Sequence, residues 1–156
     1  MYKSFGTKDI LYPKLAQDAQ IKSIHKSIRK KIKNKMDILN IKFKNIPIGE
    51  YLYDEYLRVY NKSTIDINSN HFEDYLNHVI KLCFYWHKTL DPKEIKSVIV
   101  SHTTYLIGLV SIIAIYKNIP TYRVSSTNSF YLNKKFTRSF SDFPNYSSII
   151  KKINLN

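Results

Sequence analysis

The part of the chain that most constrains its fold is the segment 98–124. The β-branched run 95–100 is typical of a buried strand, and 119–124 predicts a second strand. Between them, the apolar stretch 105–116 is too long for an ordinary strand and favours a buried helix. A strand, a helix and a strand in under about 30 residues form the parallel βαβ unit. We therefore expect an α/β fold, a Rossmann-like parallel sheet flanked by helices.

Polar loops would follow both strands of this unit, at the edge where parallel sheets bind ligands. Ser101, His102, Thr103 and Thr104 form the first loop, and Ser125 and Ser126 open the second, 125–129. Hydroxyls and helix N-terminal amides suit an anionic or sugar ligand, and histidine can act as acid, base or donor near neutral pH. The alternative is that Thr103 or Thr104 only caps the next helix, with His102 an ordinary surface residue.

The rest of the chain predicts helices joined by polar loops. A helical stripe predicts a helix from about Lys14 to Asn34 or a little beyond. The stripe consists of Ile21, Ile24, Ile28, Ile32 and Met36. Residues 41–49 suggest a short strand or an extended segment. Residues 50–60 predict a tyrosine-rich helix whose acids, Asp54 and Glu55, are either a general base or solvated. Asn70 and Glu73 resemble a capping box at the start of the next helix. We expect this helix to end at Asp91-Pro92 and to carry Cys83 on its apolar stripe.

The composition limits the classes of function. With 156 residues and 44% hydrophobic content, the chain suits one domain of ordinary size. A single cysteine excludes an internal disulfide and a multi-cysteine zinc site. The longest apolar run, 106–116, is about half of the ~20 residues that span a bilayer, and the N-terminus lacks a signal-peptide core. We expect a cytoplasmic protein that needs no metal and no cofactor.

The formal net charge of +13 is concentrated in one region. Nine basic residues and one acidic residue lie within 22–44, whereas 45–95 holds eight acids and five bases. Two interpretations are open: a solvated helix face, or a patch for anionic lipid or a phosphorylated substrate, which would make the protein membrane-peripheral. Nucleic acid is disfavoured as a partner because only four of the 25 basic residues are arginine, the preferred side chain for phosphate and guanine.

Two stretches of the chain resemble bacterial proteins of capsular and surface polysaccharide biosynthesis. Residues 46–58, IPIGEYLYDEYLR, are similar to the family's GIxIGDLIYDxYLR stretch. Residues 98–105, VIVSHTTY, followed by IPTY at 119–122, are similar to its VIVSHxxY and GIPxY segments. Residues 33–39 also resemble the segment that precedes the first stretch. The chain departs from the family at Glu50, where the family has Asp, and at Asn118, where it has Gly.

The resemblance implies a glycosyltransferase-like fold of two facing Rossmann-like domains with sugar chemistry between them. The chain would be the acceptor-side, N-terminal half, with a sugar acceptor as its partner. The nucleotide-sugar donor would be held by a C-terminal domain missing from these residues, so we expect the isolated chain to be inactive. His102 and Asp54 are then the candidate catalytic residues. The candidate substrate-binding residues are Gly49, Arg58, Ser101, Thr103, Thr104, Ser125 and Ser126.

The expected organisation is a single, incomplete domain over 1–156. It comprises a basic helical segment (1–45), a core (46–124) with the βαβ unit at 96–124, and a tail (125–156) that leads to the missing domain. Two other classes of function stay open. The chain is either a basic binding module for nucleic acid or anionic membrane, with affinity that falls steeply with salt, or a scaffold that only pairs with another subunit.

Overall fold

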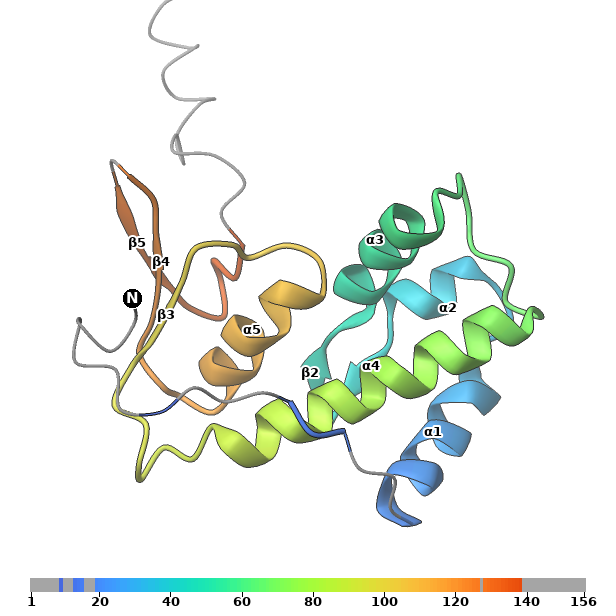
Figure 1. The fold of residues 1–156 in the computed structure, drawn as a ribbon, viewed down its shortest axis with the longest axis horizontal. Coiled ribbons are helices and arrows are strands. Elements are labelled where there is room, and N and C mark those ends of the chain that lie inside the picture. Colours follow the sequence, from blue (N-terminus) through green and yellow to red (C-terminus); the bar gives the residue numbers. More distant parts are fainter. Residues whose placement is uncertain (1–8, 10–12, 16–18, 127, 139–156) are drawn as a thin grey trace, which may run out of the picture.

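A computed structural model describes residues 9, 13–15, 19–126 and 128–138. Within these ranges, five α-helices and two small sheets form a mixed α/β fold (Figure 1). The α-helices are α1 (Ala19–Lys31), α2 (Lys35–Leu39), α3 (Gly49–Tyr60), α4 (Asn70–Thr89) and α5 (Leu109–Tyr116). The strands are β1 (Lys42–Phe43), β2 (Ile46–Pro47), β3 (Val98–Val100), β4 (Thr121–Val124) and β5 (Ser129–Leu132). In this part of the chain no helix is both long and apolar enough to cross a membrane.

The predicted βαβ unit is confirmed. Strands β3 and β4 are parallel, with Val98 opposite Thr121, and α5 connects them. The helix begins later than predicted because the loop continues to Tyr105, whose φ is 55°, and a 3₁₀ turn (Leu106–Gly108) precedes α5. At its other end Asn118, with φ 58°, follows the helix in the left-handed conformation, and the Ile119 amide donates to the Ala114 carbonyl at 2.9 Å. This is a Schellman ending, as the asparagine predicts.

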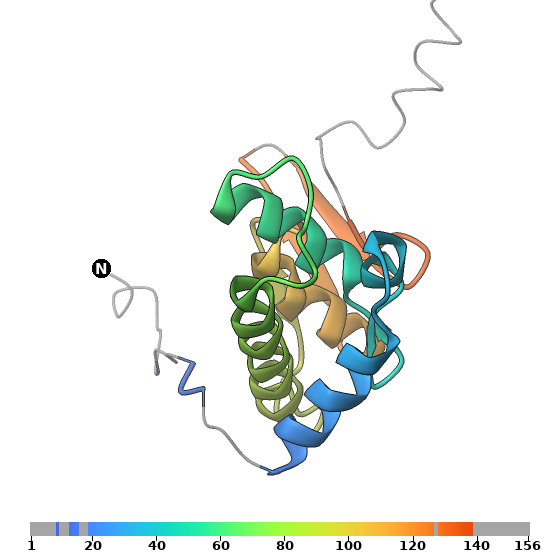
Figure 2. The same cartoon turned by 90° about the vertical axis from the view of Figure 1, so that its right-hand side faces the viewer.

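A third strand, β5, joins this sheet and was not predicted. It pairs antiparallel with β4, with Tyr122 opposite Tyr131, so the sheet order is β3-β4-β5. Val124 lies opposite Ser129, so the chain reverses direction between β4 and β5, and the predicted tail contains a strand. Helix α5 lies between this sheet and α4 (Figures 1 and 2). The rest of the predicted tail, residues 139–156, lies outside the described residues.

The basic segment forms two helices where the apolar stripe predicted one. Lys14 is not helical, and α1 ends at Lys31. Asn34 then starts α2, because its side chain accepts hydrogen bonds from the amides of Met36 (2.8 Å) and Asp37 (3.2 Å). The Met36 side chain is 56% exposed, so its place on the stripe was wrong. Local capping by Asn34 overrides the longer helical period.

The segment 41–49, for which a short strand or an extended segment was predicted, contains a hairpin of two short antiparallel strands. Phe43 of β1 lies opposite Ile46 of β2. Lys44 and Asn45 between them both have positive φ, 47° and 69°. Two central residues with positive φ are the signature of the hairpin turn that matches strand twist, so the chain reverses here.

The N-cap of helix α4 lies one residue before the predicted cap, Asn70. Ser69 is the N-cap, and its hydroxyl oxygen accepts from the Phe72 amide at 3.2 Å. Glu73 does not close a capping box, because it lies one residue beyond the N3 position counted from Ser69. Its carboxylate contacts Arg29 and, at 3.3 Å, His25 of α1. The ion pair between Arg29 and Glu73 holds α1 against α4. The predicted end of the helix before Asp91-Pro92 is confirmed, because α4 ends at Thr89.

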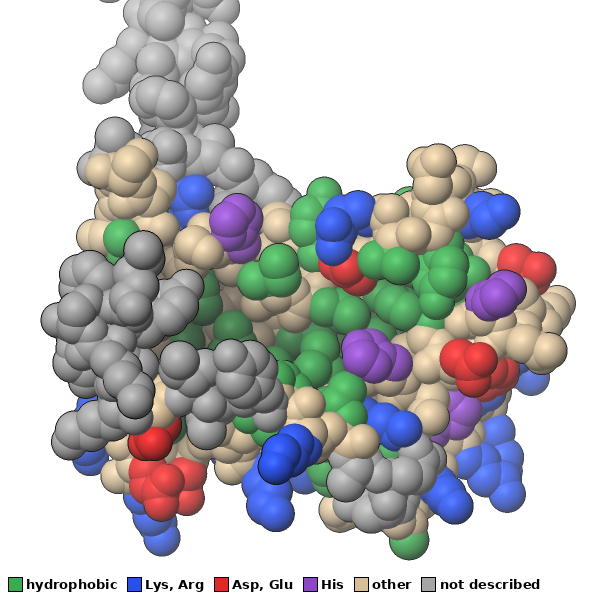
Figure 3. Space-filling view, viewed as in Figure 1, with side chains coloured by type: hydrophobic (Ala, Val, Ile, Leu, Met, Phe, Trp, Pro, Cys, Tyr) green, Lys and Arg blue, Asp and Glu red, His purple; other side chains and the backbone are tan. Residues whose placement is uncertain are grey.

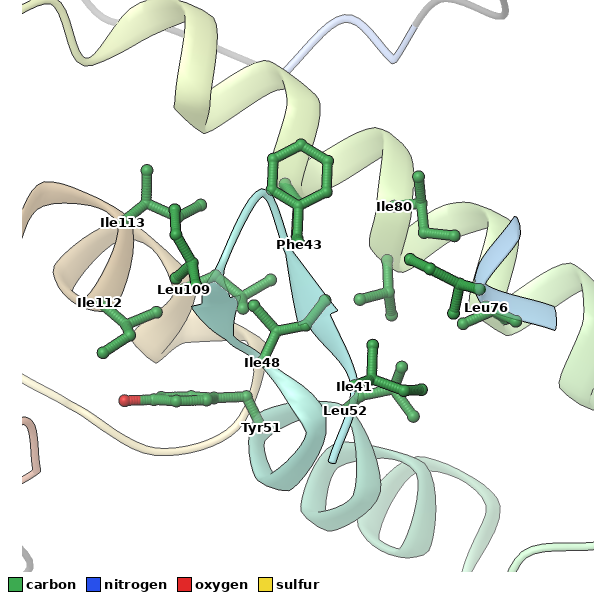
Figure 4. Close-up of a cluster of buried hydrophobic side chains, with 14 of the residues drawn as sticks. Ile41, Phe43, Ile48, Tyr51, Leu52, Leu76, Ile80, Leu109, Ile112 and Ile113 are labelled. Atoms are coloured by element: carbon green, nitrogen blue, oxygen red, sulfur yellow. The ribbon is translucent and has the colours of Figure 1, made fainter. Parts of the chain in front are cut away.

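One core joins the helical part to the βαβ unit. Phe43, Ile48 and Leu52 are fully buried between α4 and α5 (Figure 4). Leu76 and Ile80 of α4 and Leu109, Ile112 and Ile113 of α5 complete this cluster. Cys83 is also fully buried, and burial raises the pKa of its thiol. It is a core residue, as its place on the stripe predicts.

His87 gives the fold an expected dependence on pH. Burial lowers the pKa of His87 below its ordinary 6.5, and the charges of Lys44 and Lys117 act in the same direction. Above pH 6.5 the imidazole is neutral in both folded and unfolded chains. Below it the unfolded chain takes up the proton first, so stability falls as the pH drops toward the folded-state pKa.

Urea unfolding of the wild type and H87Q from about pH 7 to about pH 5 tests this expectation. The wild type should lose more stability than H87Q over this range. Equal losses would show that the folded state does not disfavour the protonated imidazole.

Candidate functional site

The candidate site lies where the loop after β3 crosses toward α3. This loop, residues 101–105, leaves the carboxyl end of β3 and passes above α5 to the start of the 3₁₀ turn (Figure 1). Because β3 and β4 are parallel, the hairpin loop after β4 leaves from the same edge of the sheet. Topology thus brings the two predicted polar loops to one edge.

Ser101 and His102 lie together at this edge, as predicted. The Ser101 Oγ and His102 Nδ1 atoms are 2.9 Å apart, and both residues are exposed. Arg123 of β4 joins them, with its Nε 3.4 Å from the Ser101 carbonyl oxygen and its guanidinium 5.7 Å from the Phe130 ring centre. The edge therefore presents a hydroxyl, an imidazole and a guanidinium.

The two threonines of the loop differ in access. Thr103 is 1% exposed, whereas Thr104 is half-buried. The N-cap residues of the 3₁₀ turn and of α5 are Tyr105 and Gly108, and neither makes a side-chain capping bond. Neither Thr103 nor Thr104 is therefore the N-cap residue of these helices.

A carboxylate from another helix takes the capping role. The Leu106 amide donates to Oε2 of Glu55 in α3 at 3.3 Å. Glu55 is 7% exposed, and its Oε1 accepts from the Arg58 guanidinium. That guanidinium lies 4.9 Å from the centre of the Tyr105 ring, a cation–π distance. Glu55 and Arg58 thus tie the loop to α3.

A second cluster lies on the first turns of α3. The Arg138 Nη1 atom is 3.2 Å from Glu50 Oε2 and 3.4 Å from Asp54 Oδ2. The Arg138 guanidinium also stacks 4.0 Å from the centre of the Tyr51 ring. Asp54, predicted as catalytic, is thus engaged by Arg138 rather than brought to His102.

Tyr51 connects the two clusters. A side chain at Gly108 would place a Cβ 2.6 Å from Tyr51 Cε1, so the ring packs directly on the turn after the loop. Burial raises the pKa of Tyr51, and the nearby Arg138 partly opposes this. A pocket of about 210 Å³ opens here. It is lined by Leu39, Pro47, Gly49, Glu50, Tyr51, Ile112, Thr137 and Arg138.

Gly49 and Ser125 have structural roles at the positions where substrate contacts were predicted. A Cβ at Gly49 would lie 2.2 Å from the Ile38 carbonyl oxygen and 2.3 Å from that of Leu39, so only glycine fits there. Ser125 closes its own hairpin: its hydroxyl accepts from the Asn128 amide at 3.1 Å. Ser126 of the same loop is exposed.

The sequence did not identify the roles of three residues of the site. These are Glu55 as the anchor of the loop, Arg123 and Arg138. A signal for Glu55 was available, since it lies four residues after Tyr51 and so shares its buried side of α3. Arg123 lies on the same face of β4 as the buried Thr121 and is itself half-buried, whereas Tyr122 and Val124 are exposed. Across the described ranges, no three His, Cys, Asp or Glu side chains gather as a metal site.

Comparisons with protein-family models, with curated proteins and with solved structures find no match for this chain.

Proposed function

We propose that this chain is the acceptor-binding half of a glycosyltransferase-like enzyme of surface polysaccharide assembly, built on a Rossmann-like sheet. One observation carries the proposal. The two stretches that resemble this family, 46–58 and 98–105, are far apart in sequence, yet Arg58 of the first lies over Tyr105 of the second. Glu55 reinforces the junction through the amide of Leu106.

The polar edge supplies groups that suit a sugar hydroxyl. In the tautomer whose Nδ1–H donates to Ser101 Oγ, the His102 Nε2 atom keeps its lone pair and can accept a proton. An acceptor hydroxyl held there would lose its proton to Nε2 as its oxygen bonds to the anomeric carbon of the donor sugar. The nucleotide diphosphate would leave with the electrons of the broken carbon–oxygen bond.

Arg123 and Ser101 would orient the acceptor. Arg123 lies next to Ser101 and carries fixed donors that can bind sugar oxygens or a carboxylate of an acidic sugar. The donor nucleotide-sugar would be bound by a domain or subunit outside these residues. The chain would act in the cytoplasm, where nucleotide-sugars are used.

NMR titration of the full chain with neutral and uronic-acid-containing oligosaccharides tests this proposal. We expect the largest shifts at the amides of 101–105 and at Arg123, and none there with a nucleotide diphosphate alone. H102Q should weaken binding about tenfold, the loss of one good hydrogen bond to a ligand. H78Q, on the exposed side of α4, is the matched control and should bind like the wild type.

Two outcomes would overturn the proposal. One is the absence of shifts in this loop with both classes of oligosaccharide. The other is sugar transfer by this chain without a second domain, which would contradict its assignment as the acceptor half.

A further inference from the structure

A surface of lysines lies apart from the candidate site, on α1 and the turn that follows it. Lys22, Lys26 and Lys30 recur every four residues, which places them along one side of the helix, and Lys33 and Lys35 follow. All five are exposed. Figure 3 shows basic side chains gathered over the region of α1, at the lower right. We call these five residues the lysine face.

Two described acids near this surface, Asp37 and Glu73, make structural contacts. Asp37 is the only acid within 22–44, and its Oδ2 accepts from the amides of Lys33 at 2.7 Å and Asn34 at 2.9 Å. Glu73 of α4 is held by Arg29. Among the described residues, none of the five lysines makes an ion pair, although Asp74 borders the Lys22 end of the face.

The shape of the surface suits many weak contacts rather than one bound ion. Lys26, Lys30 and Lys33 line a shallow hollow of about 480 Å³. Beside Lys35, Met36 is 56% exposed, an apolar side chain among cations. Lysine is a hydrated point charge that suits a diffuse anionic layer, whereas reading phosphates and bases in pairs of hydrogen bonds is the role of arginine.

We propose that the lysine face binds the anionic headgroups of a membrane surface, with Met36 entering the interfacial layer. The apolar side of α1 is not available for insertion, because Ile21 and Ile28 are buried and α1 packs on α4. Binding is thus electrostatic with one apolar contact, and it holds the protein at the membrane without a spanning helix. This role is independent of the sugar chemistry proposed above.

Vesicle co-sedimentation of the full chain tests the proposal. We expect binding to phosphatidylcholine vesicles that contain one third phosphatidylglycerol, little binding to pure phosphatidylcholine, and release by salt. A lysine near an anionic surface is worth about fivefold in the binding constant, so K26A/K30A should bind about 25-fold more weakly. The matched control is K93A/K96A, which removes two positive charges from exposed lysines between α4 and β3. It should lose far less affinity for the anionic vesicles.

A dye attached at position 36 reports on the apolar contact. In M36C the new thiol can be labelled selectively because Cys83 is fully buried. An environment-sensitive dye there should shift to the blue with anionic vesicles and not with duplex DNA.

The proposal is overturned if both vesicle types bind equally, if the two double variants lose the same affinity, or if the dye does not respond to vesicles. Binding of DNA through Lys26 and Lys30 without binding of anionic vesicles would also overturn it, in favour of a nucleic-acid surface.

Discussion

Replacing Gly49 by alanine should destabilise the protein by about 3 kcal/mol, near the upper end of the cost of overpacking. The added Cβ would lie 2.2 Å from the Ile38 carbonyl oxygen and 2.3 Å from the Leu39 carbonyl oxygen. These are backbone atoms at the end of α2, so no side-chain rotation relieves the contact. The first turn of α3 must move away from α2, and the buried contacts of Ile48 and Leu52 move with it.

Helix propensity alone predicts the opposite sign for this substitution. Alanine is favoured over glycine in a helix by up to about 1 kcal/mol, so G49A would be stabilising if space were available. Urea unfolding decides between the two. The matched control is V59A, at a 56% exposed position of the same helix, which should stay within about 0.5 kcal/mol of the wild type. A G49A protein as stable as the wild type would show that α2 and α3 are less closely packed.

The parallel unit could be predicted because its signal is local. Strand, helix and strand each have their own pattern in 98–124, and the topology then places Ser101 and His102 at the carboxyl edge of the parallel strands. Strand β5 was missed because it offers only four residues, Ser129–Leu132, after a polar loop. Its register with β4 is a tertiary pairing that no short pattern specifies.

Capping errors have a common cause. The stripe through Ile32 continues to Met36 in the sequence, but Asn34 ends the helical phase by accepting from the amides that follow it. At α4 the box residue Glu73 was identified from spacing, whereas in the fold its carboxylate is held by Arg29, 44 residues away. Residue spacing shows that a side chain can cap a helix. It does not show whether that side chain binds the local backbone amide or a residue distant in the sequence.

The candidate site also combines residues that a local pattern identifies with residues that only the fold brings together. The choice of Asp54 over Glu55 rested on a resemblance, and nothing local distinguishes two adjacent acids by charge. Helical period does distinguish them: Glu55 is buried on the Tyr51 side, and Asp54 lies on the half-exposed side. Arg138, 84 residues from Asp54, could not be assigned to this cluster from the sequence.

Replacing Glu55 by alanine should cost about 2 kcal/mol, most of it from the Leu106 amide that loses its charged acceptor. The ion pair with Arg58 adds less, because the Arg58 side chain is 53% exposed. E55Q keeps an oxygen for the amide and should lie between E55A and the wild type. D54N is the matched control: the Asp54 side chain is 41% exposed, so its loss should cost under about 1 kcal/mol.

Hydrogen exchange locates the effect. In E55A the amides of Leu106 and Gly108 should exchange faster, because the 3₁₀ turn loses the contact that holds it to α3. Amides of α1, on the other side of the core, should exchange faster only to the extent that the variant lowers the global free energy of unfolding. Equal losses in D54N and E55A, or unchanged exchange at Leu106, would show that Glu55 does not anchor the loop. If the anchor holds as described, E55A also weakens oligosaccharide binding at His102 without touching the sugar, since it releases the loop that carries His102.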